Sequence, residues 1–250
     1  MTTVHTLASG SSGNALLLSC GESYILLDAG ISCRRITAAL RELGLELGSL
    51  TAILITHTHA PVFTTERAAR ELSWRLPGAE TRLDALDFGI PQSIGEFAVT
   101  AFPTSHDAPG SCGFRLDAAG GAVGVLTDTG YVTDEAADIL EGVDLAVLEA
   151  NHDIETLRSG PYPYYLKQRI LGAQGHLSNE DARFAAVLAQ SGTSEIILAH
   201  LSRENNTPAM AQTAVERALS AAGVSPLLSV APRDCLGPAH TVSRRSVCRR

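Results

Sequence analysis

Short apolar segments separated by polar and glycine-rich turns run through most of the chain, and they follow two patterns. Short segments rich in Val, Ile and Leu predict strands, and longer segments with apolar residues at helical spacing predict helices. Strands are expected at residues 4–8, 15–19, 24–28, 52–56, 97–103, 122–127, 144–149, 195–199 and 226–230. Helices are expected at residues 32–44, 65–75, 133–140, 163–172, 179–190 and 208–222. Strands that alternate with helices in this way predict an α/β fold.

Several predicted helices begin at residues that favour a helix start. Ser32 precedes the first helix and supplies a hydroxyl suited to an N-cap. Ser178 and Asp181 resemble a capping box with Asp in place of Glu. Thr207 is followed by Pro208 at the first helical position, where the missing N–H of proline costs nothing.

The composition limits the class of protein. The chain has 250 residues, 45% of them hydrophobic, and a formal charge of -8. We expect one domain over residues 1–242, followed by a flexible basic tail at 243–250. The negative charge argues against broad non-specific binding to nucleic acid, although a local basic groove is compatible with it.

Cysteine usage and hydropathy bear on the compartment. Five cysteines are scattered without a CxxC motif, which argues against a disulfide scaffold and favours a reducing environment. The sequence shows neither a signal segment nor an apolar stretch of membrane-spanning length. We therefore expect a cytoplasmic protein that does not enter the membrane. The sequence indicates no particular protein partner.

Histidines gather at the carboxyl ends of predicted strands, where α/β proteins build their sites. Five of the eight lie there, namely His57, His59, His106, His152 and His200, and Asp128 ends the strand at 122–127. One such histidine is more often structural than functional, but this repetition favours a site. His57 and His59 form an HxH pair, which directs two imidazoles to one point as a divalent metal requires. His5 and His240 lack this context and are expected to be structural.

An ordered set of motifs carries a family resemblance. The motifs are the loop 9–14, Leu27-Asp28-Ala29-Gly30, His57-x-His59, Ser105-His106-Asp107-Ala108, Thr127-Asp128-Thr129-Gly130, Glu149-Ala150-Asn151-His152-Asp153, Gly175-His176-Leu177-Ser178 and His200-Leu201-Ser202. Together they resemble the metallo-β-lactamase fold superfamily, and most of all its YycJ/WalJ branch, over residues 1 to about 240. The resemblance implies a four-layer αββα sandwich with a metal site between the two sheets at one edge.

The resemblance also implies which residues bind metal. His57, His59 and His106 would hold a first metal, Asp128 would bridge two metals, and His200 would belong to the second. Imidazoles and a carboxylate suit Zn²⁺ or Mn²⁺. Such a site lowers the pKa of a bound water and makes hydroxide available near neutral pH, and here Asp128 is a catalytic residue as well as a ligand.

Three further residues match the family without a firm ligand role. His176 resembles a histidine that faces the scissile phosphate, where it would bind phosphate or protonate the leaving group. A loop residue near a helix start is an equally good interpretation of His176. Asp28 resembles a carboxylate that orients a metal-binding histidine, and a turn residue beside Gly30 is nearly as good. His152 is expected to support the site or contact substrate.

The chain departs from the family directly after the HxH motif. The family continues with an Asp-His pair and a helix, whereas here Ala60-Pro61-Val62 follows. Either a whole helix-sized segment is deleted and a strand begins at Pro61, or a divergent loop replaces the two ligands. In both cases the second metal keeps only Asp128 and His200.

Three functions follow from these observations. The first is a metal-dependent hydrolase of phosphodiesters, most simply nucleic acid, with activity impaired by the incomplete second metal site. The second is another hydrolase of the fold, of the thioesterase or lactonase type. The third is a catalytically degenerate relative that keeps only the fold and a single metal.

The ligand count predicts the metal content. We expect one tightly held Zn²⁺ or Mn²⁺ per chain, because the first site keeps a full ligand set and the second has lost half of its own. Elemental analysis after dialysis measures this ratio directly. A value near two per chain would show that Asp107, Asp153 or His152 completes the second site.

Overall fold

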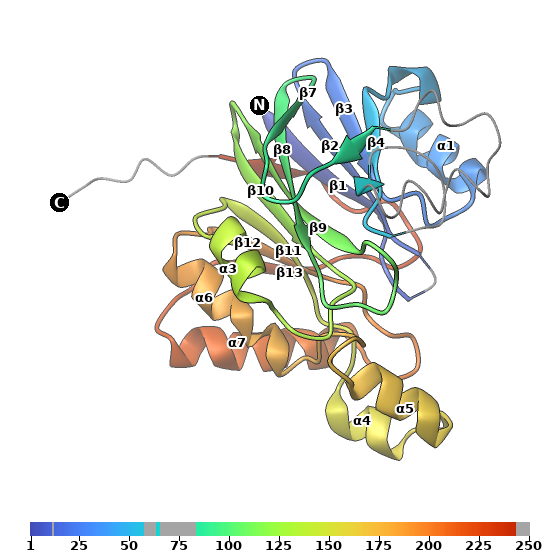
Figure 1. Ribbon diagram of the computed structural model, residues 1–250, viewed down its shortest axis with the longest axis vertical. Coiled ribbons are helices and arrows are strands. Elements are labelled where there is room, and N and C mark those ends of the chain that lie inside the picture. The colour runs from blue at the N-terminus through green and yellow to red at the C-terminus, as the bar shows by residue number, and fades with distance from the viewer. Residues whose placement is uncertain (12, 58–63, 66–83, 244–250) are drawn as a thin grey trace.

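The computed structural model describes residues 1–11, 13–57, 64–65 and 84–243 (Figure 1). Two sheets lie face to face and helices cover their outer faces (Figure 1). The first sheet has the strand order β14-β1-β2-β3-β4, and the second has the order β13-β12-β11-β10-β9-β8-β7. This is the predicted αββα sandwich of the metallo-β-lactamase fold.

The strands of the two sheets have the following bounds. The first sheet contains β1 (Thr2–Ala8), β2 (Ala15–Cys20), β3 (Ser23–Leu27), β4 (Ala52–Leu54) and β14 (His240–Val242). The second contains β7 (Gln92–Ile94), β8 (Phe97–Pro103), β9 (Cys112–Ala118), β10 (Gly121–Leu126), β11 (Leu145–Glu149), β12 (Glu195–Ala199) and β13 (Leu227–Val230). A separate parallel pair joins β5 (Thr64–Thr65) to β6 (Ala85–Leu86).

The helices of the described residues cover the outer faces. They are α1 (Cys33–Glu42), α3 (Asp134–Leu140), α4 (Ile154–Ser159), α5 (Tyr164–Leu171), α6 (Phe184–Gln190) and α7 (Pro208–Ala221), with the short 3₁₀ helices η1 (Leu47–Ser49) and η3 (Asp181–Arg183). Helix α1 packs on the first sheet, and α3, α6 and α7 pack on the second. No helix in the described part of the chain is long and apolar enough to cross a bilayer.

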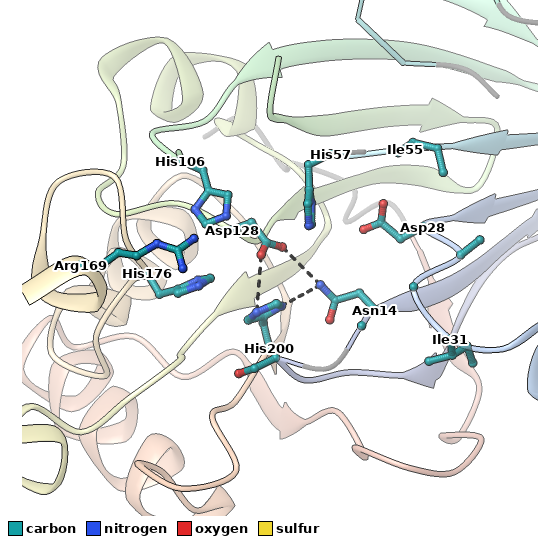
Figure 2. Close-up of a pocket in the computed structure, with 14 residues that line it drawn as sticks. Asn14, Asp28, Ile31, Ile55, His57, His106, Asp128, Arg169, His176 and His200 are labelled. Atoms are coloured by element: carbon teal, nitrogen blue, oxygen red, sulfur yellow. Dashed lines mark hydrogen bonds and ion pairs between the residues drawn. The ribbon is translucent and has the colours of Figure 1, made fainter. Parts of the chain in front are cut away.

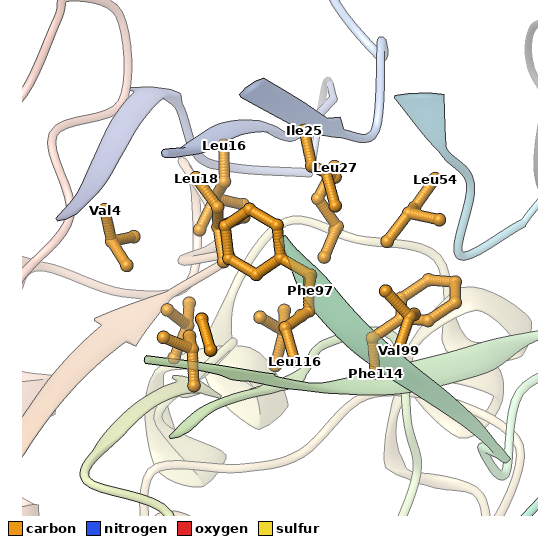
Figure 3. Packing of buried hydrophobic residues seen from close by; sticks show 14 of the residues in the cluster. Val4, Leu16, Leu18, Ile25, Leu27, Leu54, Phe97, Val99, Phe114 and Leu116 are labelled. Carbon is orange, nitrogen blue, oxygen red and sulfur yellow. The ribbon is translucent and has the colours of Figure 1, made fainter. Parts of the chain in front are cut away.

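The hydrophobic core has three parts because strands in the middle of a layered fold bury both faces. In β2, Leu16 and Leu18 point into the space between the sheets, whereas Leu17 points toward α1. In β10, Val123 and Val125 likewise face the other sheet. Figure 3 shows the inter-sheet cluster, in which Phe97, Phe114 and Leu116 meet Leu18, Ile25 and Leu54.

Most of the predicted helices are confirmed, with small changes at their ends. Ser32 and Thr207 accept hydrogen bonds at their N-caps from the backbone N–H groups of Arg35 and Met210. The helix predicted from residue 179 begins as η3 and continues as α6, because the Ser178 hydroxyl accepts from Asp181 N and closes a tight first turn. The helix predicted at 65–75 and the tail from 244 lie outside the described residues.

Some elements were not predicted. Helix α4 begins where the Asp153 carboxylate accepts a hydrogen bond from Thr156 N at 2.8 Å. Strand β9 was missed because Arg115 and Asp117 gave its pattern a polar character. These two side chains pair at 2.9 Å, and Arg115 also donates to the carbonyls of Ile139 and Glu141 at the C-terminus of α3. Arg115 therefore satisfies carbonyl groups at the end of a helix, while the side chains on the opposite face of β9 are buried.

The inter-sheet cluster predicts how core substitutions change stability. Phe114→Ala removes a ring with 0% exposure, and we expect it to lower the free energy of unfolding by about 3–5 kcal/mol. Phe88→Ala is the control, because that ring is 40% exposed, and it should cost less than about 1 kcal/mol. Urea denaturation followed by circular dichroism measures both, and equal losses would contradict this description of the core.

Candidate metal centre

Residues at the ends of five strands meet in one cavity between the two sheets. Asp28 follows β3, His57 follows β4, His106 follows β8, Asp128 follows β10, and His200 follows β12. The cavity has a volume of about 610 Å³. Figure 2 shows the side chains of His57, His106, His176 and His200 gathered around Asp128. The structure thus brings together the described residues that the sequence assigned to the metal site.

Three of these residues have a left-handed backbone, which side chains other than glycine seldom adopt. The φ angles are 61° at Asp28, 56° at Asp128 and 57° at His200. Each follows directly or closely on the end of a buried strand, so this conformation turns the chain sharply. Strain of this kind persists where the surrounding structure holds it, and it is concentrated at functional sites.

The histidine rings are held through their Nδ1 atoms. His106 Nδ1 lies 3.1 Å from the carbonyl oxygen of Gly175, to which it donates. His200 Nδ1 lies 2.7 Å from Asn14 Nδ2, and its Nε2 lies 3.5 Å from Asp128 Oδ1. Donation from Nδ1 orients the other ring nitrogen of His106, as in known metal sites, whereas His200 Nδ1 accepts from the amide of Asn14.

Asn14 links the first sheet to the residues of the second. Its amide nitrogen lies 3.3 Å from Asp128 Oδ2, and its side-chain oxygen accepts from Gly10 N at 3.2 Å (Figure 2). The loop that carries it passes very close to Gly30, since a Cβ on Gly13 would lie 1.9 Å from Gly30 O. Glycine at position 13 therefore allows the approach that places Asn14 at the site.

Glu149 and His176 form a buried acid–imidazole pair. Glu149 Oε1 lies 2.8 Å from His176 Nδ1, and Oε2 accepts from the backbone N–H of Thr129 at 2.9 Å. Burial opposes the charge on His176, but the carboxylates of Glu149 and Asp128 outweigh it and raise the pKa of His176 to about 9. His176 is therefore an imidazolium near neutral pH in the metal-free protein.

The two carboxylates of the cavity differ in their electrostatics. Burial alone would raise the pKa of Asp128, but the surrounding histidines, led by His200 and His57, lower it to about 2. Burial raises the pKa of Asp28 to about 6, although His57 and the hydrogen bonds from Thr56 oppose this rise. Thr56 Oγ1 lies 2.9 Å from both Asp28 Oδ2 and His57 Nδ1, so it connects the carboxylate to the ring.

The donor set fits a divalent transition metal. Ligand atoms of His106, Asp128 and His176 lie within 4.8 Å of one another, and so do those of Glu149, His176 and His200, so His176 in its neutral form is a candidate ligand as well. Imidazoles with a carboxylate suit Zn²⁺ or Mn²⁺. Two side chains considered as ligands of a second metal have other partners: Asp107 binds Arg169 at 2.5 Å, and Asp153 caps α4.

Two sequence predictions about the site stay predictions. His59 and the turn at 59–61 lie outside the described residues, so the deletion and the divergent loop both remain open. His152 does not line the cavity and is 1% exposed. Its backbone oxygen accepts from Asn179 N at 2.8 Å, which fixes the segment after His176.

Sequence reasoning placed Asn14 and Glu149 within motifs without giving either a role, and it missed Arg169. Glu149 carried a signal, because it is a carboxylate at the end of the otherwise apolar strand Leu145–Glu149. Asn14 ends the loop 9–14, whose Ser and Gly residues fit a plain hairpin turn as well as a loop of the site. Arg169 reaches the cavity from α5, and helical spacing gave no sign of this (Figure 2).

Comparison with known families agrees with the fold and the cavity. The chain matches the Beta-lactamase superfamily domain over residues 60–201 and the Metallo-beta-lactamase superfamily over residues 8–61. It therefore belongs to the metallo-β-lactamase superfamily, and it is a hydrolase of that fold.

Individual relatives narrow the class. The chain is 38% identical to the exodeoxyribonuclease WalJ of Streptococcus pneumoniae, over 86% of this chain and 87% of the relative. It is 34% identical to the exodeoxyribonuclease YycJ of Bacillus anthracis, over 87% of this chain and 89% of the relative. The crystal structure of the metallo-β-lactamase fold protein YhfI from Bacillus subtilis superposes with a TM-score of 0.72 at 16% identity, covering 94% of this chain and 98% of that one. The protein is thus a homologue of exodeoxyribonucleases.

The burial of His152 predicts a pH dependence of stability. Neither ring nitrogen has a hydrogen-bond partner among the described residues, and burial lowers the pKa of His152 from 6.5 to about 4. Between these pH values His152 is protonated in the unfolded chain but not in the folded chain. The free energy of unfolding therefore falls as the pH falls. The contribution is on the order of 3 kcal/mol.

His152→Leu removes this titration. We expect the free energy of unfolding of the variant, measured in urea with a chelator present, to fall less between pH 6.5 and 4 than that of the wild type. Parallel pH profiles would show that His152 takes up its proton equally well in both states.

Proposed function

We propose that the protein is a metal-dependent exodeoxyribonuclease that hydrolyses phosphodiester bonds of DNA. The observation that carries this proposal is the Glu149–His176 pair, whose charged imidazole lies beside His106 and Asp128. A protonated imidazole next to metal ligands suits an ester with a poor leaving group, such as the oxygen of a sugar. The names of the two relatives support DNA as the substrate.

His57, His59, His106 and Asp128 would hold a first Zn²⁺ or Mn²⁺, and Asp128 with His200 would face a second. When bound, such a metal polarises a phosphoryl oxygen and lowers the pKa of a water molecule. We expect the first metal to be held tightly and the second weakly, with activity below that of a relative whose ligand set is complete.

Different residues of the cavity would then have different roles in hydrolysis. Water attacks phosphorus and releases a proton to solvent, one P–O ester bond breaks, and the departing sugar oxygen takes a proton from His176, which solvent then reprotonates. Glu149 favours the protonated form of His176 and fixes its orientation through Nδ1. Arg169 lines the same cavity and would neutralise charge on the bound phosphate.

Substrates with different leaving groups test the role of His176. In DNA the departing alkoxide needs a proton, whereas the p-nitrophenolate of bis(p-nitrophenyl) phosphate does not. We expect His176→Ala to lower kcat on DNA by about 10²–10⁴-fold and to lower it far less on the nitrophenyl ester. Glu149→Gln should show the same selectivity to a smaller degree.

The controls separate this role from the alternatives. His240→Gln changes a histidine that pairs with Glu195 away from the cavity, and it should leave both activities unchanged. Equal losses on both substrates together with a lower metal content would make His176 a ligand instead. Turnover of a thioester alone would favour the thioesterase type, and no turnover by the metal-loaded wild type would favour a degenerate relative.

A further inference from the structure

Helices α4 and α5 project together from the body of the protein (Figure 1). We name residues 154–171 the arm. Its surface carries two adjacent aromatic side chains, Tyr164 and Tyr165, which are 77% and 73% exposed. Two adjacent exposed rings offer apolar area whose burial against a partner is favourable.

The arm borders the cavity that holds the proposed active site. Tyr162, Leu166 and Arg169 of the arm line a hollow of about 170 Å³ together with His106 and His176. Arg169 also lines the main cavity, and Figure 2 shows its side chain extending toward His176. A DNA strand with one phosphate at His176 would therefore place its neighbouring nucleotides against the arm.

Helical geometry places an exposed ring in line with Arg169. Tyr165 and Arg169 are four residues apart in α5, so they share one face of the helix. Leu166 and Ile170, one position further along, line the hollow together with Arg169. The exposed face of α5 thus runs from an arginine at the site to a tyrosine at the far end of the helix.

The arm is held in a fixed shape. Lys167 Nζ donates to Arg158 O at 2.7 Å and ties α5 to α4. Pro161 and Pro163 lie in the connection and restrict its backbone. Rings presented on a rigid support lose little conformational freedom when they bind.

The charge of the protein determines which kind of contact is available. The formal charge of -8 argues against broad binding of DNA through a basic surface. Stacking of bases on aromatic rings needs no charge and tolerates any sequence. Bases stacked inside a duplex offer no free faces, whereas unpaired nucleotides do.

We propose that the arm is a stacking platform for unpaired nucleotides of the DNA strand whose phosphodiester occupies the cavity. Tyr164 and Tyr165 contact base faces, and Arg169 contacts the phosphate between these bases and the scissile bond. This inference rests on the proposed function for its substrate.

The test compares Tyr164→Ala/Tyr165→Ala with the wild type in the full chain, metal-free for binding and metal-loaded for hydrolysis. We expect binding of a fluorescent single-stranded oligonucleotide, measured by anisotropy with chelator, to weaken at least about tenfold. Hydrolysis of bis(p-nitrophenyl) phosphate should not change, because this ester has no bases. Tyr164→Phe/Tyr165→Phe keeps the rings and should bind as the wild type does.

Two controls make the result specific. Tyr131→Ala removes a ring that is 51% exposed and lines neither hollow at the site, and it should leave binding unchanged. A single-stranded oligonucleotide that lacks the bases expected to contact the arm should bind equally to the wild type and to the double alanine variant.

The outcomes distinguish this inference from the proposed function. Unchanged oligonucleotide binding in the double alanine variant, or a changed oligomeric state in light scattering, overturns the arm as a nucleotide platform while DNA hydrolysis still stands. If the wild type hydrolyses no DNA, the proposed function fails, and the binding comparison still decides the role of the arm.

Discussion

The Glu149 carboxylate has no exposure to solvent, and a buried charge of this kind is costly unless it is paired. Glu149 meets this requirement with three partners: the backbone N–H groups of Thr129 and Leu177, and the ring of His176. These partners come from the turn after β10 and from the loop before η3. One carboxylate at the end of β11 therefore fixes the position of Asp128 from one side and of His176 from the other.

The sequence was sufficient to predict the layered fold and the place of the site, because both follow from regular spacing. Buried strands are recognisable as apolar segments, and polar residues directly after them lie at the edge of the sheet where the strands end. His57, His106 and Asp128 could be assigned for this reason. Asn14 and Arg169 could not, because a loop and a helix reach the site through tertiary packing, which leaves no periodic signal.

The charge state of the site was equally hidden in the sequence. His176 gains its raised pKa from a carboxylate 27 positions earlier in the chain, and Asp128 is surrounded by histidines from four separate segments. Each effect depends on distances of a few ångströms between residues far apart in sequence. The order of motifs identifies the residues of such a site. The charges on these residues depend on distances that only the three-dimensional structure gives.

The residues of the site are divided between the two sheets: Asn14, Asp28 and His57 belong to the first, and His106, Asp128 and His200 belong to the second. The side chains packed between the sheets thus act as the spacer that sets the width of the site. A core substitution that leaves the protein folded but lets one sheet slide on the other would separate the ligands without touching any of them. Evolution of this chain is therefore constrained at its interior by geometry as well as by stability, and neutral change should collect on the outward faces of α1, α6 and α7.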